Sequence, residues 1–350
     1  MIKKMSFNSN LISWFDANKR ELPWRISKDP YKIWLSEIIL QQTKVKQGLP
    51  YYIKFIKNYP TVYELAIAKE DEIMKNWQGL GYYSRAINLH LTAKHIVKKL
   101  NGVFPKKSID LIKLSGVGDY TASAIASICF EEPVAVLDGN VFRVLSRYFG
   151  IETPINTSHG IRQFKCLAKS LLPNKRIGDY NQSIMEFGAL QCKPKSPSCN
   201  ICPINKNCIA FSTNKVKCLP VKIKKNKIKN RYINFLVFIS KKSETIIEKR
   251  NNKGIWKNLY QFPMIETNDS ISKKKLLSNK IFINEYYSDF KKIELINNNE
   301  IIHKLSHQKL HIKFWKIHVN KKVDELIKWE DLKKFAVPSP IAEFINSYKP

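Results

Sequence analysis

The spacing of apolar residues divides the chain into two regions of different character. Over the first 190 residues, apolar side chains recur every three or four positions, which is the period of an amphipathic helix. The segments predicted to be helical on this basis are 31–42, 84–100, 108–114, 119–130, 140–149 and 160–172. Ser108 and Asp110 at the start of one segment, and Gly150 after another, are typical of helix ends. The N-terminal region is therefore predicted to be mostly helical.

Beyond residue 231 the pattern changes to short runs of β-branched and aromatic residues. The segments RYINFLVFIS (231–240) and HIKFWKIHVN (311–320) are predicted to be strands, because apolar and polar residues alternate over short stretches in them. Mixed helical and strand patterns between the two segments indicate a separate α+β domain over 229–350.

A basic segment joins the two regions. The stretch TNKVKCLPVKIKKNKIKNR (213–231) is rich in lysine and contains no acidic residue, so we interpret it as a solvated linker. A plain connector is the simpler role, and contact with a polyanion is the alternative. The predicted organisation is a helical domain over 1–212, a basic linker over 213–228 and the α+β domain over 229–350.

Net charge narrows the class of partner. The 350 residues carry a formal net charge of +31, from 60 basic and 29 acidic residues. Such an excess favours a nucleic acid as partner, although the compositional bias of an AT-rich genome explains part of it equally well. No apolar run reaches the roughly 18 residues of a membrane span, and the N-terminal segment lacks the features of a secretory signal. We therefore expect a soluble intracellular protein.

A glycine turn lies between two of the predicted helices, in LSGVGDYTASAI (114–125). The third glycine of a dinucleotide-binding loop is missing, and no Gly-Lys-Ser/Thr follows, so both common nucleotide-binding loops are excluded. A helix, a glycine hairpin and a second helix would expose backbone N–H groups to one phosphate of a nucleic acid backbone. The residues of this candidate phosphate site are Gly116, Val117 and Gly118.

Four of the seven cysteines, Cys192, Cys199, Cys202 and Cys208, lie within 17 residues of one another. An odd total with one tight group points to a metal site and not to a disulfide framework. Four thiolates suit either a zinc ion or a [4Fe–4S] cluster. Because zinc ribbons normally pair two Cys-x2-Cys units and only one is present, the spacing favours iron and sulfur.

A resemblance to a known family emerges when these features are combined. The glycine hairpin, the segment VLDGNVFRVLSR that contains Asp138, and the cysteine spacing together resemble the helix-hairpin-helix DNA glycosylases of the endonuclease III superfamily. The segments YKIWLSEIILQQT (31–43) and GLGYYSRA (79–86) closely resemble the MutY family of adenine glycosylases. The resemblance implies a mostly α-helical glycosylase domain with an iron–sulfur loop, followed by a MutT-like (Nudix-like) α+β domain.

Cleavage of an N-glycosidic bond needs an acid for the departing base and a negative charge near the sugar cation. Glu37 is the only acidic residue in an otherwise apolar helix, a setting that raises the pKa of a carboxyl group. The resemblance assigns protonation of adenine to Glu37, stabilisation of the sugar cation to Asp138 and orientation of the sugar or a water to Asn140. Each of the two acidic residues also has a purely structural interpretation: Glu37 as an exposed glutamate on a helix face, and Asp138 as a helix cap.

Tyr120 occupies the position at which strand-cleaving relatives carry the lysine that attacks C1′. A phenol cannot form an imine, so we expect a monofunctional glycosylase without efficient lyase activity.

The resemblance also implies a set of DNA contacts. Gln41, Gln42 and Tyr82 would lie beside an 8-oxoguanine opposite the adenine, and Lys193 and Lys195 would approach phosphates. In the C-terminal domain, Ser306 and His307 match a lesion-contacting loop, although Leu305 replaces its phenylalanine; a polar turn is the alternative interpretation. The Nudix hydrolase signature is absent, so this domain is expected to recognise and not to hydrolyse.

The expected partner is double-stranded DNA with adenine opposite 8-oxoguanine or guanine, bound by a monomer with one [4Fe–4S] cluster in the bacterial cytoplasm, at the nucleoid. Three alternatives remain open on the sequence. A mismatch thymine or uracil glycosylase can also carry tyrosine behind the hairpin. A non-catalytic DNA-binding iron–sulfur protein and a basic RNA-binding protein are the others, and no RNA-recognition motif supports the last.

Overall fold

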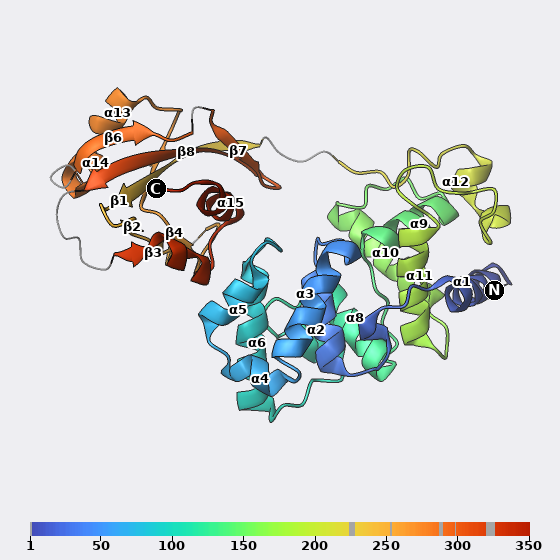
Figure 1. The fold of residues 1–350 in the computed structure, drawn as a ribbon. Coiled ribbons are helices and arrows are strands. Elements are labelled where there is room, and N and C mark those ends of the chain that lie inside the picture. Colours follow the sequence, from blue (N-terminus) through green and yellow to red (C-terminus); the bar gives the residue numbers. More distant parts are fainter. Residues whose placement is uncertain (1, 224–227, 253, 287–289, 298, 320–325) are drawn as a thin grey trace. The chain divides into compact units, whose positions relative to one another are not determined.

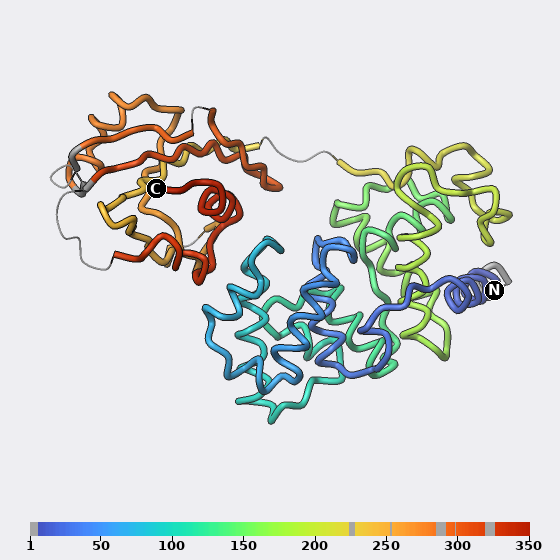
Figure 2. The backbone as a smooth tube through the Cα atoms, viewed as in Figure 1, coloured from blue at the N-terminus to red at the C-terminus, as the bar shows by residue number. Residues whose placement is uncertain are grey.

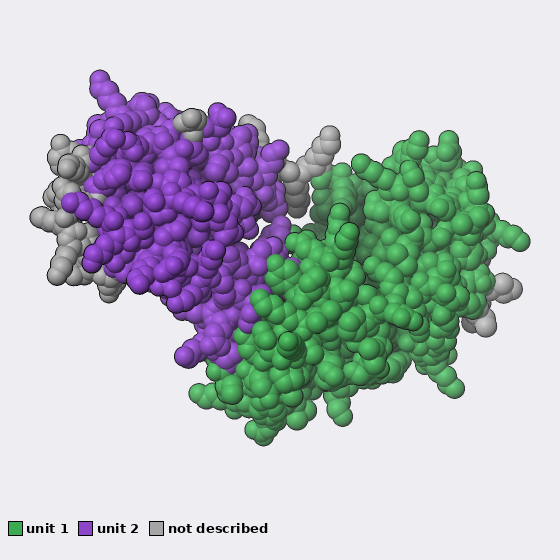
Figure 3. Space-filling view, in the orientation of Figure 1, with its two compact units in different colours: residues 1–67, 88–224 green, residues 68–87, 225–350 purple. Residues whose placement is uncertain are grey.

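A computed structural model of the chain describes residues 2–223, 228–252, 254–286, 290–297, 299–319 and 326–350. Contacts group the chain into two compact units (Figure 3). The first unit comprises Met1–Ile67 and Asn88–Lys224, and the second comprises Ala68–Ile87 and Lys225–Pro350. Among the described residues, none of the helices combines the length and apolarity that a membrane span requires.

The first unit is helical, as predicted (Figure 1). Its helices, with α6 shared between the units, are α1 (Ile2–Asn18), α2 (Pro30–Leu40), α3 (Val45–Asn58), α4 (Val62–Ile67), α6 (Ser84–Leu100), α7 (Ser108–Leu111), α8 (Asp119–Phe130), α9 (Gly139–Phe149), α10 (Ser158–Leu171), α11 (Ile177–Leu190) and α12 (Ile209–Ser212), with short 3₁₀ turns η1 (Pro23–Arg25) and η2 (Asn205–Asn207).

All six predicted helices are present, and the differences lie at their ends. The helix predicted to reach residue 42 ends at Leu40, and the helix predicted over 108–114 is the single turn α7, because the chain then enters the glycine hairpin. Helix α10 begins earlier than predicted, at Ser158, where the Thr157 side chain accepts a hydrogen bond from the backbone of Gly160. Gly150 ends α9 in the left-handed conformation, as its position suggested.

Helix α11, in the yellow-green part of the backbone (Figure 2), packs against α1, α8 and α9. Two glycines permit this approach. A Cβ atom on Gly178 would lie 2.7 Å from the backbone oxygen of Ser127 in α8, and one on Gly188 would lie 2.7 Å from Cβ of Asn140 in α9. Because α11 is buried on nearly every side, its apolar residues lack the one-sided period of a surface helix, which explains why the sequence did not single it out.

The second unit contains a five-stranded sheet in the order β5-β1-β8-β6, with β7 also paired to β8. Its strands are β1 (Lys229–Ile239), β5 (Met264–Thr267), β6 (Phe290–Leu295), β7 (Ile301–Lys304) and β8 (Gln308–Val319), and the short pairs are β2 (Glu244–Thr245) with β9 (Ile327–Lys328) and β3 (Glu248–Lys249) with β4 (Tyr260–Gln261). Both predicted strands are confirmed as β1 and β8, which pair in parallel, with Phe235 opposite Phe314. Asn320, the last residue of the second predicted strand, and residues 224–227 of the predicted linker lie outside the described residues.

The central sheet is buried on both faces. Leu236 and Trp315 face a core that includes α13 (Lys273–Leu277) and α14 (Lys280–Tyr286). On the other face, Phe314 stacks on Phe344 of α15 (Ser339–Ser347), with ring centroids 3.9 Å apart. Burial on both faces accounts for the nearly continuous apolar run of β1.

The second unit also includes α5 (Glu70–Trp77) and the start of α6. Lys249 Nζ lies 2.6 Å from Asp71 Oδ1, and the Tyr260 hydroxyl lies 3.1 Å from the other oxygen of the same carboxylate. Lys75 Nζ donates to the carbonyl oxygen of Phe335 at 3.0 Å. These bonds attach segment 68–87 to the loops around the sheet, so the units are not the same ranges as the domains read from the sequence.

Substitution of Gly178 tests the close approach of α11 to α8. An alanine in a helix normally stabilises it by about 0.5–1 kcal/mol relative to glycine, whereas overpacking costs about 1–3 kcal/mol. Since the new Cβ would meet backbone atoms of Ser127 and Ile128 at 2.7 and 2.9 Å, Gly178→Ala is expected to lower the free energy of unfolding, as measured by urea titration with circular dichroism. The control Ser170→Ala, on the exposed face of α10, should change it by less than about 0.5 kcal/mol. An unchanged or more stable Gly178→Ala protein would contradict the packing.

Candidate active site

Glu37 lies on α2 among buried apolar residues, and is itself half-buried. Asp29 caps the helix by accepting a hydrogen bond from the backbone of Tyr31 at 2.9 Å, and Pro30 occupies its first position. Burial raises the pKa of Glu37 to about 7; the negative charge of Asp138 acts in the same direction, while a hydrogen bond with Tyr120 opposes it. Glu37 is therefore a carboxyl group that holds its proton up to neutral pH.

Asp138 lies immediately before α9 and caps it. Its Oδ1 accepts hydrogen bonds from the backbone N–H groups of Asn140 at 2.9 Å and Val141 at 2.8 Å, and its Oδ2 accepts one from the Asn140 side chain at 2.7 Å. Burial raises the pKa of Asp138, but these three donors and the charge of Arg143 favour the anion. The structural role considered from the sequence, a helix cap, is thus present together with burial next to Glu37.

Tyr120 lies in the first turn of α8 and brings the two carboxyl groups into one site. Burial, followed by the negative charges of Glu37 and Asp138, raises the pKa of Tyr120 well above its ordinary value, so the phenol stays neutral. Its hydroxyl also lies 3.2 Å from Sδ of Met185 in α11. The structure therefore gathers Glu37, Tyr120 and Asp138 from α2, α8 and the start of α9.

Arg143 connects the fourth candidate, Asn140, to the beginning of the cysteine loop. Its Nη2 donates to Asn140 Oδ1 at 2.8 Å and to the carbonyl oxygen of Gly188 at 2.6 Å, and its Nε donates to the carbonyl oxygen of Cys192 at 2.7 Å. The guanidinium is buried. Arg143 was not among the residues predicted from the sequence. The available signal was an arginine among the apolar residues of the amphipathic helix α9.

The glycine hairpin has the geometry that its sequence suggests. Gly116 has a φ of +76°, and a Cβ atom there would lie 2.7 Å from Cβ of Asn88. Val117 is buried, whereas Gly118 caps α8 and is exposed. The first amide groups of α8 have no partner within the helix and point out of its N-terminus, as an anion site requires.

The two glutamines after α2 differ in their surroundings. Gln41 Nε2 lies 3.3 Å from both the carbonyl oxygen of Gly116 and Oγ1 of Thr121, so its side chain braces the hairpin. Gln42 is exposed and has a φ of +53°. Tyr82, in the second unit, is 46% exposed, has a φ of +47° and lies under the Arg85 guanidinium, 5.7 Å from the ring centroid.

A buried carboxylate on α11 is a feature that sequence reasoning missed. Glu186 accepts hydrogen bonds from the guanidinium groups of Arg20 and Arg25. Burial alone would raise the pKa of Glu186, but these two partners lower it to about 2. The available signal was the one that identified Glu37, a lone acidic residue among apolar ones, here in SIMEFGAL. Beside this group, Trp24, Arg25 and Gln182 line a cavity of about 80 Å³.

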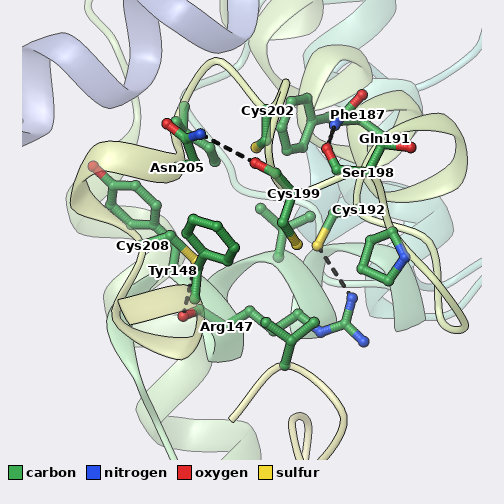
Figure 4. Close-up of a pocket in the computed structure, with 15 residues that line it drawn as sticks. Arg147, Tyr148, Phe187, Gln191, Cys192, Ser198, Cys199, Cys202, Asn205 and Cys208 are labelled. Carbon is green, nitrogen blue, oxygen red and sulfur yellow. Dashed lines mark hydrogen bonds between the residues drawn. The ribbon is translucent and has the colours of Figure 1, made fainter. Parts of the chain in front are cut away.

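The four cysteines of the sequence motif line one small pocket (Figure 4). Its walls are otherwise largely apolar and include Val144, Tyr148, Phe187, Ile204 and Phe211. Burial raises the pKa of Cys202 to about 11, so its thiolate would need a nearby positive charge. Within the described ranges, no three His, Cys, Asp or Glu side chains are arranged to hold a single metal ion.

Arg147 fixes the start of the cysteine loop. Its guanidinium lies 3.4 Å from Cys192 Sγ (Figure 4). It also donates to the carbonyl oxygens of Lys193 at 2.8 Å and Pro194 at 3.1 Å. The side chains of Lys193 and Lys195 are exposed on this loop. The backbone of the loop is thus held from inside while its lysines face outward.

The C-terminal candidates lie at the tip of the β7–β8 hairpin. The Leu305 N–H donates to the carbonyl oxygen of Gln308 at 2.8 Å, which closes the turn. Ser306 and His307 are exposed there, with Ser306 Oγ 3.2 Å from His307 Nδ1. The turn is therefore polar and exposed, with Leu305 half-buried at its base.

Family models match both regions of the chain. Residues 35–166 match the HhH-GPD superfamily base excision DNA repair protein, and residues 234–347 match the NUDIX domain. The first match contains Glu37, the hairpin and Asp138, and the second contains the hairpin tip with Ser306 and His307.

Solved structures resemble the helical region. A thermostable thymine-DNA glycosylase aligns with a TM-score of 0.56 and 30% identity over 60% of this chain and 97% of its own. An endonuclease III–DNA covalent complex aligns with a TM-score of 0.53 and 21% identity over 61% of this chain and 99% of its own, which shows a shared fold. The expected fold class, a helix-hairpin-helix glycosylase domain with a Nudix-like α+β domain, is confirmed.

Relatives of known sequence match over the whole length. The adenine DNA glycosylase of Buchnera aphidicola subsp. Baizongia pistaciae (strain Bp) is 37% identical over 98% of this chain and 97% of its own length. That of Buchnera aphidicola subsp. Schizaphis graminum (strain Sg) is 37% identical over 98% and 99%, respectively. With the paired carboxyl groups, the hairpin and both domains in place, the chain belongs to the adenine DNA glycosylase family of base excision repair enzymes.

Proposed function

We propose that this enzyme removes adenine from duplex DNA where it is mispaired with 8-oxoguanine or guanine, as a monofunctional glycosylase. The observation that carries the proposal is the pair of half-buried carboxyl groups, Glu37 and Asp138, that both act on Tyr120. Glu37 has a pKa raised to about 7, while Asp138 has three hydrogen-bond donors that favour its anion. Two carboxyl groups whose surroundings drive them to opposite protonation states are suited to acid catalysis and cation stabilisation.

In the proposed reaction the target adenine leaves the base stack and enters the site, at a cost of a few kcal/mol. Glu37 donates its proton to the base as the N-glycosidic bond breaks, and the bonding electron pair leaves with adenine. The Asp138 carboxylate stabilises the positive charge that develops on the sugar. Water then adds to C1′ and loses a proton, which completes the hydrolysis. Asn140, hydrogen-bonded to Asp138, keeps that carboxylate oriented.

Tyr120 limits the chemistry to base removal. Its phenol has no amine with which to form a Schiff base at C1′, and its raised pKa keeps it neutral. In this proposal Tyr120 contributes by shaping the pocket and by its hydrogen bond with Glu37.

The proposed DNA contacts come from the exposed parts of the site. The amide groups at Gly116, Val117 and Gly118 would bind one phosphate, and Lys193 and Lys195 others. Gln42 suits insertion beside the opposing base better than Gln41, because it is exposed whereas Gln41 braces the hairpin.

For the C-terminal domain, we propose recognition of 8-oxoguanine by Ser306 and His307 at the hairpin tip, with Tyr82 as a further contact. Leu305, in place of the phenylalanine of the family, keeps apolar packing at this position but supplies no aromatic ring. The property that this change would affect is selectivity for 8-oxoguanine over guanine. The proposed domains are 1–212, catalytic, and 229–350, lesion recognition, joined by a basic linker over 213–228. We further propose a monomer that acts in the bacterial cytoplasm.

For Cys192, Cys199, Cys202 and Cys208 we propose one [4Fe–4S] cluster. The donor set fits, since all four thiols line a single pocket with otherwise largely apolar walls. One tetrahedral zinc ion would need all four sulfurs about 2.3 Å from one point, whereas a four-iron cluster binds each sulfur to a different iron. When bound, it would tie the loop to α9 and α11.

Thymine excision is the second candidate. It is favoured by the 30% identity of the helical region to a thermostable thymine-DNA glycosylase. The raised pKa of Glu37 and the C-terminal domain favour adenine.

Single-turnover assays with three duplexes test the substrate. Duplexes with adenine opposite 8-oxoguanine and adenine opposite guanine should release adenine, the first faster, and a duplex with thymine opposite guanine should release little base. Strand cleavage should lag far behind base release, with no adduct trapped by borohydride. Preferential release of thymine would favour the second candidate, and cleavage that keeps pace with release would contradict the role of Tyr120.

Two isosteric substitutions and a pH profile test the chemistry. Glu37→Gln and Asp138→Asn should each slow excision by at least about 10²-fold, the scale of one acid or electrostatic group, and leave duplex binding intact. Because an acid must be protonated, the wild-type rate should fall as pH rises through about 7. The control is Glu152→Gln, an exposed carboxylate paired with Lys215. Normal excision by either active-site variant removes that residue from the mechanism.

Metal analysis tests the cofactor. Purified protein should contain iron and inorganic sulfide and absorb near about 400 nm, as expected of a cluster ligated by four thiolates. Cys202→Ser should lose the absorbance, whereas Cys218→Ser, at an exposed cysteine outside the pocket, should keep it. Colourless protein with one zinc ion would overturn the assignment.

A further inference from the structure

The Glu186 carboxylate is a buried, extensively hydrogen-bonded acidic group of the first unit that the mechanism leaves unused. Its side chain is 2% exposed. It accepts five hydrogen bonds: from Arg20 N at 3.0 Å, Nε at 2.8 Å and Nη2 at 2.6 Å, and from Arg25 Nη1 at 3.0 Å and Nη2 at 2.9 Å. Arg25 Nη1 also donates to the carbonyl oxygen of Arg20 at 3.0 Å. A single carboxylate thus fixes the backbone and both guanidinium groups of the segment 20–25.

We propose that Glu186 is a positioning residue for the reaction: it holds Arg25 in place near Glu37 and neutralises one of the two positive charges that this segment brings to the site. The inference rests on the proposed role of Glu37 as the acid that protonates adenine.

The charge balance of the three groups gives the physical reason. With Glu186 ionised, Arg20, Arg25 and Glu186 together carry one positive charge; without the carboxylate they would carry two. Positive charge stabilises the ionised form of a nearby carboxyl group, and an ionised Glu37 has no proton to give. A site that needs both a guanidinium next to the acid and a protonated acid must therefore limit the charge of that guanidinium.

The other groups around Glu37 do not provide this control. Tyr120 and Cys129 face it from α8, and burial keeps both protonated and neutral, with the pKa of Cys129 raised to about 12. Asp138, before α9, is negative and acts against ionisation of Glu37. Among the described residues, the cation whose charge acts on Glu37 is Arg25, from η1. Its anchor is Glu186 on α11.

A purely structural role is the competing explanation, since removal of one partner from a buried ion pair is strongly destabilising whatever the chemistry nearby. The two explanations differ in the sign of an observable effect. Loss of Glu186 adds a positive charge, and loss of Arg20 or Arg25 removes one. A structural role predicts lower stability in all three cases and the same protonation of Glu37.

The test is a direct titration of the Glu37 carboxyl group by NMR in protein labelled with ¹³C at the glutamate carboxyl carbon. The resonance is assigned by its absence in Glu37→Gln. We expect Glu186→Gln to lower the titration midpoint by about one pH unit, the scale of one nearby charge. Arg20→Met, which removes one positive charge but keeps the Glu186–Arg25 pair, should leave the midpoint unchanged or raise it. Thermal unfolding of each variant reports the structural cost separately.

A wild-type midpoint in Glu186→Gln, or the same downward shift in Arg20→Met, would overturn the proposal. Should Glu186→Gln fail to fold, Arg25→Met decides instead, because loss of the cation must raise the midpoint by a similar amount. In single-turnover excision of adenine, the decline of the rate at high pH should move with the midpoint. A wild-type protein that released no adenine would refute the proposed function, while the carboxyl titration would still decide the role of Glu186.

Discussion

Two neighbouring, largely desolvated carboxyl groups cannot both lose their protons without a large cost in free energy, and the active site is organised around that constraint. The structure resolves it by unequal hydrogen bonding. Asp138 receives two backbone N–H groups and one side-chain amide, so the negative charge belongs there. Glu37 lies in an apolar helix, where the Tyr120 hydrogen bond and the charge of Arg25 oppose the larger effect of desolvation, so Glu37 keeps the proton. The number of hydrogen-bond donors around each carboxyl group thus decides which one is the acid and which one is the anion.

The anion is in turn connected to the cysteine loop. From Asp138 the bonds lead to Asn140, then to Arg143, and from there to the carbonyl oxygens of Gly188 and Cys192. Arg147, one turn after Arg143 on α9, holds the next part of the loop. A group bound by the four thiols would stabilise this folded loop, because binding free energy adds to the free energy of folding. Arg143 therefore links the orientation of Asp138 to the start of the cysteine loop, and Arg147 holds the residues that follow.

Features that are local in the sequence could be predicted, and features made by distant segments could not. The glycine hairpin, the lone Glu37 in an apolar helix and the cysteine spacing are each contained in a short stretch, and the helices around them were found to within a few residues. The Glu186–Arg20 contact joins residues 166 positions apart, and no local pattern specifies it. The parallel pairing of β1 with β8 is likewise a property of the folded sheet, since alternation identifies a strand and not its neighbour.

Helix α11 explains why these distant contacts converge. Its successive turns carry Asn181, which bonds the backbone of Val134 and Val136 ahead of Asp138, then Met185 next to Tyr120, and Glu186 on the two arginines. None of these side chains belongs to a motif, yet each fixes a segment that supplies a chemical group. Because α11 packs against α1, α8 and α9, errors in its packing would displace the elements that carry Tyr120 and Asp138. The positions of the motif residues therefore depend on contacts from a helix whose own sequence gives little sign of function.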